Sequence, residues 1–348
     1  MKAAVLYGNE DIRYDDYETP EVEPGTVKIA VKASGICGSD VPRVLHNGAH
    51  YYPIVLGHEF AGEVVEVGEG VTKVKVGDTV TGAPRIPCMV CADCVAGNIA
   101  QCTHDSFIGS RQQGSFAEYV VIPEANAVPY DPSVPAETAV FFEPATVAAH
   151  GVMQNDYAGG EYVAVIGAGT IGLFVVQWAK IFGSRKIVVF DVDDERLALA
   201  KGFGADEGVN SLSEGYLEKA KGLTAGAGYA QVFEAVGSNA TLLMALELAA
   251  AKAHVGLIGT PHDTVSFTKP QWEIINRKEL TLRGFWQGYS LPFPGREWEL
   301  TAHYFATGQL RADPSFIDRK YPLSEAAEAF ARFKNPKNIH GKILLVNQ

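Results

Sequence analysis

Apolar and polar positions follow two different rhythms along the chain. Before about residue 140, short apolar runs at 27–33, 63–67 and 116–122 are separated by long segments containing Gly, Pro and Asp. Such runs predict short strands joined by long loops. We therefore expect a β-rich first region whose loops carry much of the function.

From residue 161 the apolar runs alternate with helical patterns. Strands are predicted at 162–166, 186–191, 232–236, 254–259 and 280–285, and helices at 170–182 and 195–204. Alternation of this kind predicts a parallel sheet covered by helices on both faces. Helices at 297–307 and 324–333 and a strand at 342–346 follow. That strand needs a sheet to join, and the sheet of the first region is one place for it.

Composition narrows the range of functions. The chain has 348 residues, 47% of them hydrophobic, and a net charge of −12 at pH 7. This length suggests two domains, and the negative charge disfavours nucleic acid and anionic membranes as partners. We find neither an apolar stretch of about 20 residues that would span a bilayer nor a signal-peptide core. We therefore expect the protein in the cytoplasm.

A glycine-rich turn, GAGTIG, lies between predicted strand 162–166 and the helix that follows it. An aspartate ends the next strand, 19 residues after the last glycine of the turn. This context is typical of a dinucleotide site, because the turn and the helix N-terminus approach the pyrophosphate while the aspartate binds the ribose hydroxyls. The aspartate would repel a 2′-phosphate, which favours NAD over NADP. The alternative is a glycine-rich turn without a nucleotide. The residues expected at the cofactor are Gly167, Gly169, Thr170, Ile171, Gly172, Asp191 and Arg196.

Four of the five cysteines lie close together in the chain, and they are Cys88, Cys91, Cys94 and Cys102. Short Cys-x2-Cys spacings place sulfurs around a single Zn²⁺ in a tetrahedron, and four thiolates leave no open position. We therefore expect a structural zinc. A disulfide or free buried thiols are the alternatives, and a reducing compartment disfavours the disulfide.

A second set of metal-binding residue types is dispersed along the chain. Cys37 lies in SGICGSD, His58 and Glu59 lie in LGHEF, and Glu143 precedes a proline. Each has an ordinary structural explanation, such as a small buried thiol or a hydrogen-bonded imidazole. Their spacing alone does not show that they converge.

Taken together, GxCGSD, GHE, the cysteine segment, the Glu-Pro pair and GAGTIG resemble the zinc-dependent medium-chain dehydrogenase/reductases over essentially the whole chain. SGICGSD and Glu-Pro point to the polyol, sorbitol-type branch. HNGAHYYPIVLGHEF, FIGSR and YSLPFPGREWE are similar to the galactitol-1-phosphate 5-dehydrogenase subfamily. The resemblance implies an α/β protein: a GroES-like β-rich catalytic domain at 1–150 with the zinc lobe, an NAD-binding Rossmann domain with a doubly wound parallel sheet at 151–286, and a return to the catalytic domain at 287–348. It also implies a homodimer or homotetramer.

The resemblance implies that Cys37 and His58 bind a catalytic zinc, with Glu59 or Glu143 as the third protein ligand. Which carboxylate binds stays open. The family usually has a histidine five residues after the ligand cysteine, and this chain has Pro42 there. The usual proton exit is therefore absent.

The proton of the substrate hydroxyl needs another route in this chain. His46 or His50 is one candidate, and Ser39, which follows the ligand cysteine closely, is placed to accept the proton and pass it through the cofactor ribose to water.

The predicted reaction is hydride transfer from a sugar-alcohol phosphate, such as galactitol 1-phosphate, to NAD, with zinc as the Lewis acid. Arginine side chains can bind the substrate phosphate through two hydrogen bonds. Arg43 and Arg111 are the leading candidates, ahead of Lys278 and Arg296. One rival is a dehydrogenase of free polyols (sorbitol, xylitol) or pentitol phosphates. The other is a non-catalytic zinc- and nucleotide-binding regulatory protein, for which one zinc per chain is expected instead of two.

Overall fold

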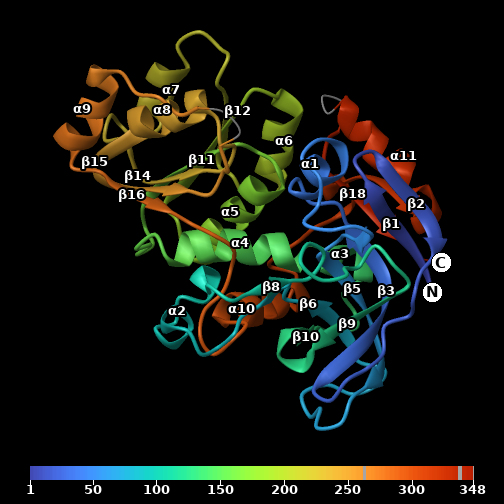
Figure 1. Ribbon diagram of the computed structural model, residues 1–348. Helices are drawn as coiled ribbons and strands as arrows, with labels where there is room; N and C mark the ends of the chain where they lie inside the picture. The colour runs from blue at the N-terminus through green and yellow to red at the C-terminus, as the bar shows by residue number, and fades with distance from the viewer. Residues whose placement is uncertain (262–263, 336–338, 348) are drawn as a thin grey trace. The chain divides into compact units, whose positions relative to one another are not determined.

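The computed structural model describes residues 1–261, 264–335 and 339–347 (Figure 1). The chain forms two compact units, one of Met1–Glu143 with Tyr289–Gln348 and one of Pro144–Gly288. Among the described residues, no helix is long and apolar enough to cross a membrane.

The first unit is built mainly of β-strands. Its largest sheet has the order β10-β6-β5-β3-β18-β17, and β9 also pairs with β3. In β3, Val27, Ile29 and Val31 alternate with more exposed positions and pack into the unit's apolar core, as a strand with one buried face requires. The strands of this unit are β1 Lys2–Gly8, β2 Asp11–Asp16, β3 Thr26–Gly35, β4 Ile54–Val55, β5 Glu59–Val67, β6 Thr79–Gly82, β7 Arg85–Ile86, β8 Ser106–Phe107, β9 Tyr119–Pro123, β10 Ala127–Pro129, β17 Ile317–Pro322 and β18 Lys342–Val346.

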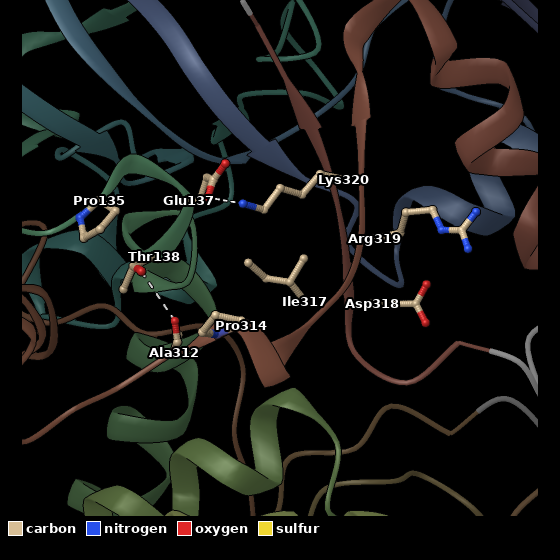
Figure 2. Close-up of a pocket in the computed structure, with 9 residues that line it drawn as sticks. All are labelled: Pro135, Glu137, Thr138, Ala312, Pro314, Ile317, Asp318, Arg319 and Lys320. Carbon is tan, nitrogen blue, oxygen red and sulfur yellow. Dashed lines mark hydrogen bonds and ion pairs between the residues drawn. The ribbon is translucent and has the colours of Figure 1, made fainter.

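Short helices connect these strands. They are α1 Asp40–Leu45, α2 Ala92–Val95, α3 Ala136–Ala139, α10 Arg296–Ala306 and α11 Ala326–Ala331. Figure 2 shows where β17 meets the segment of α3, around a pocket of about 440 Å³. Lys320 is paired with Glu137 there, and the hydroxyl of Thr138 donates to the carbonyl of Ala312. These contacts attach the late part of the chain to the early part.

The strand predicted at 342–346 is confirmed with the same bounds and lies inside the large sheet. β18 pairs antiparallel with β3, with Leu344 opposite Gly35, and parallel with β17. Its residues are buried except at the far end because strands flank it on both sides. The late segment therefore completes a sheet begun near the start of the chain.

The second unit contains the predicted parallel sheet. Its order is β13-β12-β11-β14-β15-β16, and all its pairings are parallel. The sheet grows from β11 in one direction and then from β14 in the other, so the strand order reverses between these two. Its strands are β11 Tyr162–Ile166, β12 Lys186–Asp191, β13 Glu207–Asn210, β14 Tyr229–Glu234, β15 Ala249–Leu257 and β16 Thr281–Gly284.

The helices of this unit alternate with its strands along the chain. They are α5 Thr170–Ile181, α6 Asp194–Gly202, α7 Tyr216–Gly222, α8 Asn239–Leu248 and α9 Lys269–Lys278. Asp193 is the N-cap that precedes α6, and its side chain accepts hydrogen bonds from the amides of Glu195 and Arg196, which fixes where the helix begins.

Several elements differ from the sequence expectations, and three of them have a clear physical reason. Helix α4, Phe142–Met153, was not predicted, because its first turns are buried all round and show no amphipathic period. The strand predicted at 116–122 begins at Tyr119, since the amide and carbonyl of Phe116 bond instead to Leu56 and Ala4. The helix predicted at 324–333 is α helical only over α11, with a 3₁₀ turn on either side.

Candidate metal centres and nucleotide site

Three metal-binding side chains converge in the first unit. Cys37 follows β3, His58 directly precedes β5, and Glu59 is the first residue of β5. The two strands are antiparallel with Gly35 opposite Glu59, so their register brings the three residues to one place. The Cys37 sulfur, a ring nitrogen of His58 and a carboxylate oxygen of Glu59 all lie within 4.8 Å of one another.

The chemistry of this set fits a zinc ion. A thiolate, an imidazole and a carboxylate are ligands that catalytic zinc sites use, and three protein ligands leave the fourth position for water or substrate. His58 and Glu59 are buried, and the carboxylate of Glu59 lies against Nζ of Lys342. Several anionic ligands gathered in one buried place are costly to keep charged, and a cation held by this set would relieve that cost.

Glu143 also belongs to the neighbourhood of this set. It is a buried residue in the first turn of α4. Burial raises the pKa of Glu143 to about 7; the charge of His58 opposes this rise and that of Glu59 adds to it. Burial and the charge of Glu59 likewise raise the pKa of the Cys37 thiol. A bound divalent cation favours the charged forms of these acids, so both Glu59 and Glu143 stay candidates for the third ligand.

Asp40 supports His58, and the sequence analysis missed it. This fully buried carboxylate lies with Oδ1 3.6 Å from Nδ1 of His58, and Oδ2 accepts the amide of Cys37 at 3.1 Å. At this distance the carboxylate attracts the Nδ1 side of the ring without a hydrogen bond, which favours the other nitrogen as the one that faces a metal. The ring of Phe107 also meets His58 edge-on, with centroids 5.4 Å apart. Asp40 could have been found from the sequence, because it is the aspartate that ends the motif SGICGSD.

Lys342 is the second residue that sequence reasoning missed. It is the first residue of β18, and its Nζ lies 2.7 Å from Oε1 and 2.6 Å from Oε2 of Glu59. The pattern of an apolar strand gave no reason to assign a charged residue at its start to the metal site. Only the pairing of β18 with β3 brings it there.

The residues expected to accept the hydroxyl proton or to bind the substrate phosphate differ in their exposure and in their partners. Ser39 is exposed at the start of α1, and its hydroxyl makes no capping bond. Arg43 donates to the carbonyl of Ser39 at 2.7 Å and lies 3.6 Å from Asp40. Arg111 is paired with Asp105 at 3.1 Å, a carboxylate that the buried Arg85 also contacts.

The other candidates differ in their contacts. Lys278, in the second unit, donates to the carbonyls of Leu246, Glu247 and Ala249, which explains that lysine structurally. Arg296 begins α10, and His46 and His50 are exposed around the end of α1.

The four clustered cysteines form a second candidate metal-binding set, because the sulfurs of Cys88, Cys91, Cys94 and Cys102 all lie within 4.8 Å of one another. All are free thiols in the structure. Backbone amides, first that of Cys94 and then that of Thr103, lower the pKa of Cys91 to about 6, whereas burial raises that of Cys94 to about 12. Amide-to-sulfur hydrogen bonds stabilise thiolates, so this set fits a closed structural zinc.

The glycine-rich turn in the second unit has the geometry expected of a dinucleotide site. Gly167 follows β11 with φ of +95°, and a Cβ on Gly172 would lie 1.8 Å from the carbonyl oxygen of Gly167. Gly169 precedes α5, and a Cβ there would meet nothing within 4 Å, so the backbone is open to a ligand. Asp191 ends β12, and its carboxylate accepts the amides of Ala168 at 2.7 Å and Asp193 at 3.0 Å. Arg196 lies 3.8 Å from Asp193.

Comparison with known proteins places this chain in a family. Residues 23–132 match the alcohol dehydrogenase GroES-like domain, and residues 170–303 match the zinc-binding dehydrogenase family. The chain is 37% identical over 350 residues to galactitol 1-phosphate 5-dehydrogenase of Escherichia coli (strain K12), covering 99% of this chain and 100% of the relative. The chain belongs to the zinc-dependent medium-chain dehydrogenases.

As a zinc-dependent medium-chain dehydrogenase, the chain is an oxidoreductase, and the non-catalytic alternative is set aside. The crystal structure of galactitol-1-phosphate dehydrogenase from Escherichia coli is similar to it with a TM-score of 0.93 and 36% identity, covering 99% of this chain and 100% of that one. A provisionally assigned zinc-binding dehydrogenase from Sinorhizobium meliloti 1021, solved with NADP, is similar with a TM-score of 0.88 and 29% identity. The match covers 99% of this chain and 98% of that one. The expected combination of GroES-like and Rossmann folds is confirmed.

Proposed function

We propose that this dehydrogenase oxidises a sugar-alcohol phosphate, such as galactitol 1-phosphate, to a ketose phosphate with NAD as the hydride acceptor. The observation that carries the proposal is the convergence of Cys37, His58 and Glu59 within 4.8 Å. The substrate class is supported by the full-length similarity to a galactitol 1-phosphate 5-dehydrogenase. We also propose that the enzyme is a cytoplasmic homodimer or homotetramer.

The residues around the metal set have distinct tasks in this reaction. A zinc ion bound there supplies Lewis acidity that lowers the pKa of the substrate hydroxyl. Cys37, His58 and either Glu59 or Glu143 hold it, and Asp40 orients His58 through Nδ1. The Oγ atom of Ser39 accepts the hydroxyl proton, which an exposed side chain can pass on to water.

The preference for NAD rests on Asp191. Its carboxylate ends β12 beside the glycine-rich turn, where a negative charge accepts ribose hydroxyls and repels a 2′-phosphate. A structure of a 29% identical relative holds NADP, so the preference needs a test in this chain.

Changing Asp191→Asn is expected to raise kcat/KM with NADP and lower it with NAD, moving their ratio by about 10- to 100-fold, because hydrogen bonds to charged groups contribute about 1.5–3 kcal/mol. Steady-state kinetics with both cofactors measure this ratio. Asparagine keeps an oxygen for the amide of Ala168 but loses the acceptor for the amide of Asp193, so the ratio of the two cofactors, which share any change in the turn, is the quantity compared. A ratio equal to that of the wild type would remove Asp191 from cofactor selection.

The proposed preference for a phosphorylated substrate is tested by comparing phosphorylated and free polyols. The wild-type enzyme, followed by NADH formation with and without added zinc, is expected to prefer galactitol 1-phosphate over galactitol, sorbitol and xylitol. A preference for a free polyol or a pentitol phosphate would favour the rival substrate classes. A flat response to every polyol phosphate would overturn the proposed substrate while leaving the family membership intact.

Arg111→Ala is expected to raise KM for the phosphorylated polyol by about 10- to 100-fold, since an arginine–phosphate contact is a charge-assisted hydrogen bond. KM for a free polyol should change little. Arg277→Ala is the matched control, because Arg277 is an exposed arginine paired with Glu273 on α9 of the other unit. Equal effects on phosphorylated and free substrates would exclude Arg111 from phosphate binding.

A further inference from the structure

A buried arginine, Arg85, shares the carboxylate of Asp105 with Arg111. Nη1 of Arg85 lies 2.9 Å from Oδ2 of Asp105, and Nη1 of Arg111 lies 3.1 Å from the same oxygen. The side chains of Arg85 and Asp105 are 6% and 13% exposed, whereas that of Arg111 is 49% exposed. The three residues, which we call the Arg85–Asp105–Arg111 triad, therefore connect a buried charge to an exposed one.

The backbone of Arg85 is fixed by two buried side chains. Its amide donates to the hydroxyl oxygen of Tyr289 at 3.0 Å, and its carbonyl accepts the side-chain amide of Asn126 at 2.7 Å. Tyr289 and Asn126 are both buried. Arg85 is therefore a fixed point from which the guanidinium holds Asp105.

Strand pairing ties the buried end of the triad to the metal-binding set of the same unit. β7 pairs with β8, and Arg85 lies opposite Phe107 in this pairing. The ring of Phe107 meets that of His58 edge-on, with centroids 5.4 Å apart. One side chain therefore separates the strand position of Arg85 from a candidate metal ligand.

The segment that carries Arg111 is packed against the residue before His58. A Cβ on Gly109 would lie 2.2 Å from the carbonyl oxygen of Gly57, so the two backbones touch. The same carbonyl accepts the amide of Ser115 at 2.9 Å, at the other end of the segment. Arg111 thus lies in a loop whose two ends are both attached next to His58.

The charges of the triad explain how an arginine paired with an aspartate remains able to bind an anion. Asp105 paired with Arg111 alone would form a neutral pair, which attracts a phosphate weakly. Arg85 offsets the charge of Asp105, so the triad keeps one net positive charge, and its exposed member is Arg111. A phosphate monoester carries about −1.5 to −2 charges at pH 7, and a guanidinium binds it through two parallel hydrogen bonds.

We propose that Arg85 and Asp105 are positioning residues for the phosphate of the substrate: Asp105 holds the guanidinium of Arg111, and Arg85 compensates the charge of Asp105. The inference rests on the sugar-alcohol phosphate of the proposed function. Arg85 acts through Asp105, so its effect is expected on substrates that carry a phosphate and not on free polyols.

The test compares Arg85→Met with Arg85→Lys. Arg85→Met leaves Asp105 to neutralise Arg111, and it is expected to raise KM for galactitol 1-phosphate by about 10-fold, the scale of one unit charge acting near a protein surface. KM for galactitol should not change. Arg85→Lys keeps the charge and is expected to restore a KM close to that of the wild type. Inorganic phosphate, used as an inhibitor of polyol oxidation, should bind more weakly to Arg85→Met in the same proportion.

Two further variants separate positioning from structural support. Arg85→Met with Asp105→Asn returns the net charge to one positive, so its KM for galactitol 1-phosphate is expected closer to the wild type than that of Arg85→Met alone. Arg332→Met is the matched control, because Arg332 pairs with Asp318 at 3.1 Å in the same unit and is 26% exposed. It is expected to lower the unfolding temperature and to change neither KM.

Several outcomes would overturn the inference. They are an Arg85→Met enzyme with wild-type KM and wild-type inhibition by phosphate, an equal rise in KM for both substrates, and a double variant no better than the single one. If Arg85→Met does not fold, a double variant with KM raised as far as in Arg111→Ala has the same meaning. A wild-type enzyme that oxidises galactitol as well as its phosphate, but loses inhibition by inorganic phosphate in Arg85→Met, would instead reject the proposed substrate and keep the anion site.

Discussion

A Cys37→Ser enzyme is expected to lose one of two zinc ions per chain and to lose kcat/KM by at least about 10³-fold. The thiolate is one of three protein groups that meet at the candidate catalytic centre, and serine cannot replace it as a soft anionic ligand at neutral pH. Lewis-acid assistance contributes several kcal/mol to such a reaction, and each 1.36 kcal/mol corresponds to tenfold in rate. Metal analysis by mass spectrometry and NADH-coupled kinetics measure the two losses.

The control for Cys37→Ser is cofactor binding. Asp191 and the glycine-rich turn belong to the other unit, so the affinity for NADH, measured by fluorescence titration, is expected to stay within about twofold. A Cys37→Ser enzyme that keeps two zinc ions and wild-type turnover would remove Cys37 from the metal centre and contradict the proposed reaction.

Cys94→Ser is expected to remove the other zinc ion and to open the segment from Cys88 to Cys102 to proteases. This segment has little else to hold it: α2 has four residues, and Val90 and Val95 are 81% and 72% exposed. Binding of a structural zinc contributes about 10–16 kcal/mol in isolated zinc-finger peptides, so its loss is expected to loosen this segment. Limited digestion with proteinase K and the unfolding temperature measure the effect.

The two cysteine variants are expected to differ in stability and in turnover, and this difference distinguishes a structural from a catalytic zinc. Cys94→Ser is expected to lower stability more than Cys37→Ser, and to affect turnover less at a temperature where the protein stays folded. A Cys94→Ser protein that keeps two zinc ions and resists the protease as the wild type does would favour the free-thiol alternative.

Features that are encoded by neighbouring residues could be predicted from the sequence, whereas features that depend on distant residues could not. The bounds of β11 and the start of α5 were predicted because an apolar run, a glycine turn and a helix lie consecutively in the chain. The four cysteines were recognisable as a set for the same reason. Helix α4 was missed because a segment buried all round carries no periodic signal.

The centre around Cys37 depends on strand register, which the local sequence does not encode. Its residues meet because β3 pairs with β5, and Lys342 joins them because β18 pairs with β3. The family resemblance supplied Cys37, His58, Glu59 and Glu143 as candidates. Asp40 was overlooked although it ends the motif SGICGSD, and no pattern indicated Lys342. The arrangement of this centre is a property of the folded sheet rather than of any one motif.

The place of β18 in the sheet has a consequence for how the protein matures. Leu344 pairs with Gly35, 309 residues earlier, while the unit of Pro144–Gly288 is contiguous in the chain. During synthesis the contiguous unit emerges whole, and the sheet of the other one waits for its last strand. We therefore expect the unit of Pro144–Gly288 to become native first, with the sheet around Cys37 completed only after β18 has been synthesised.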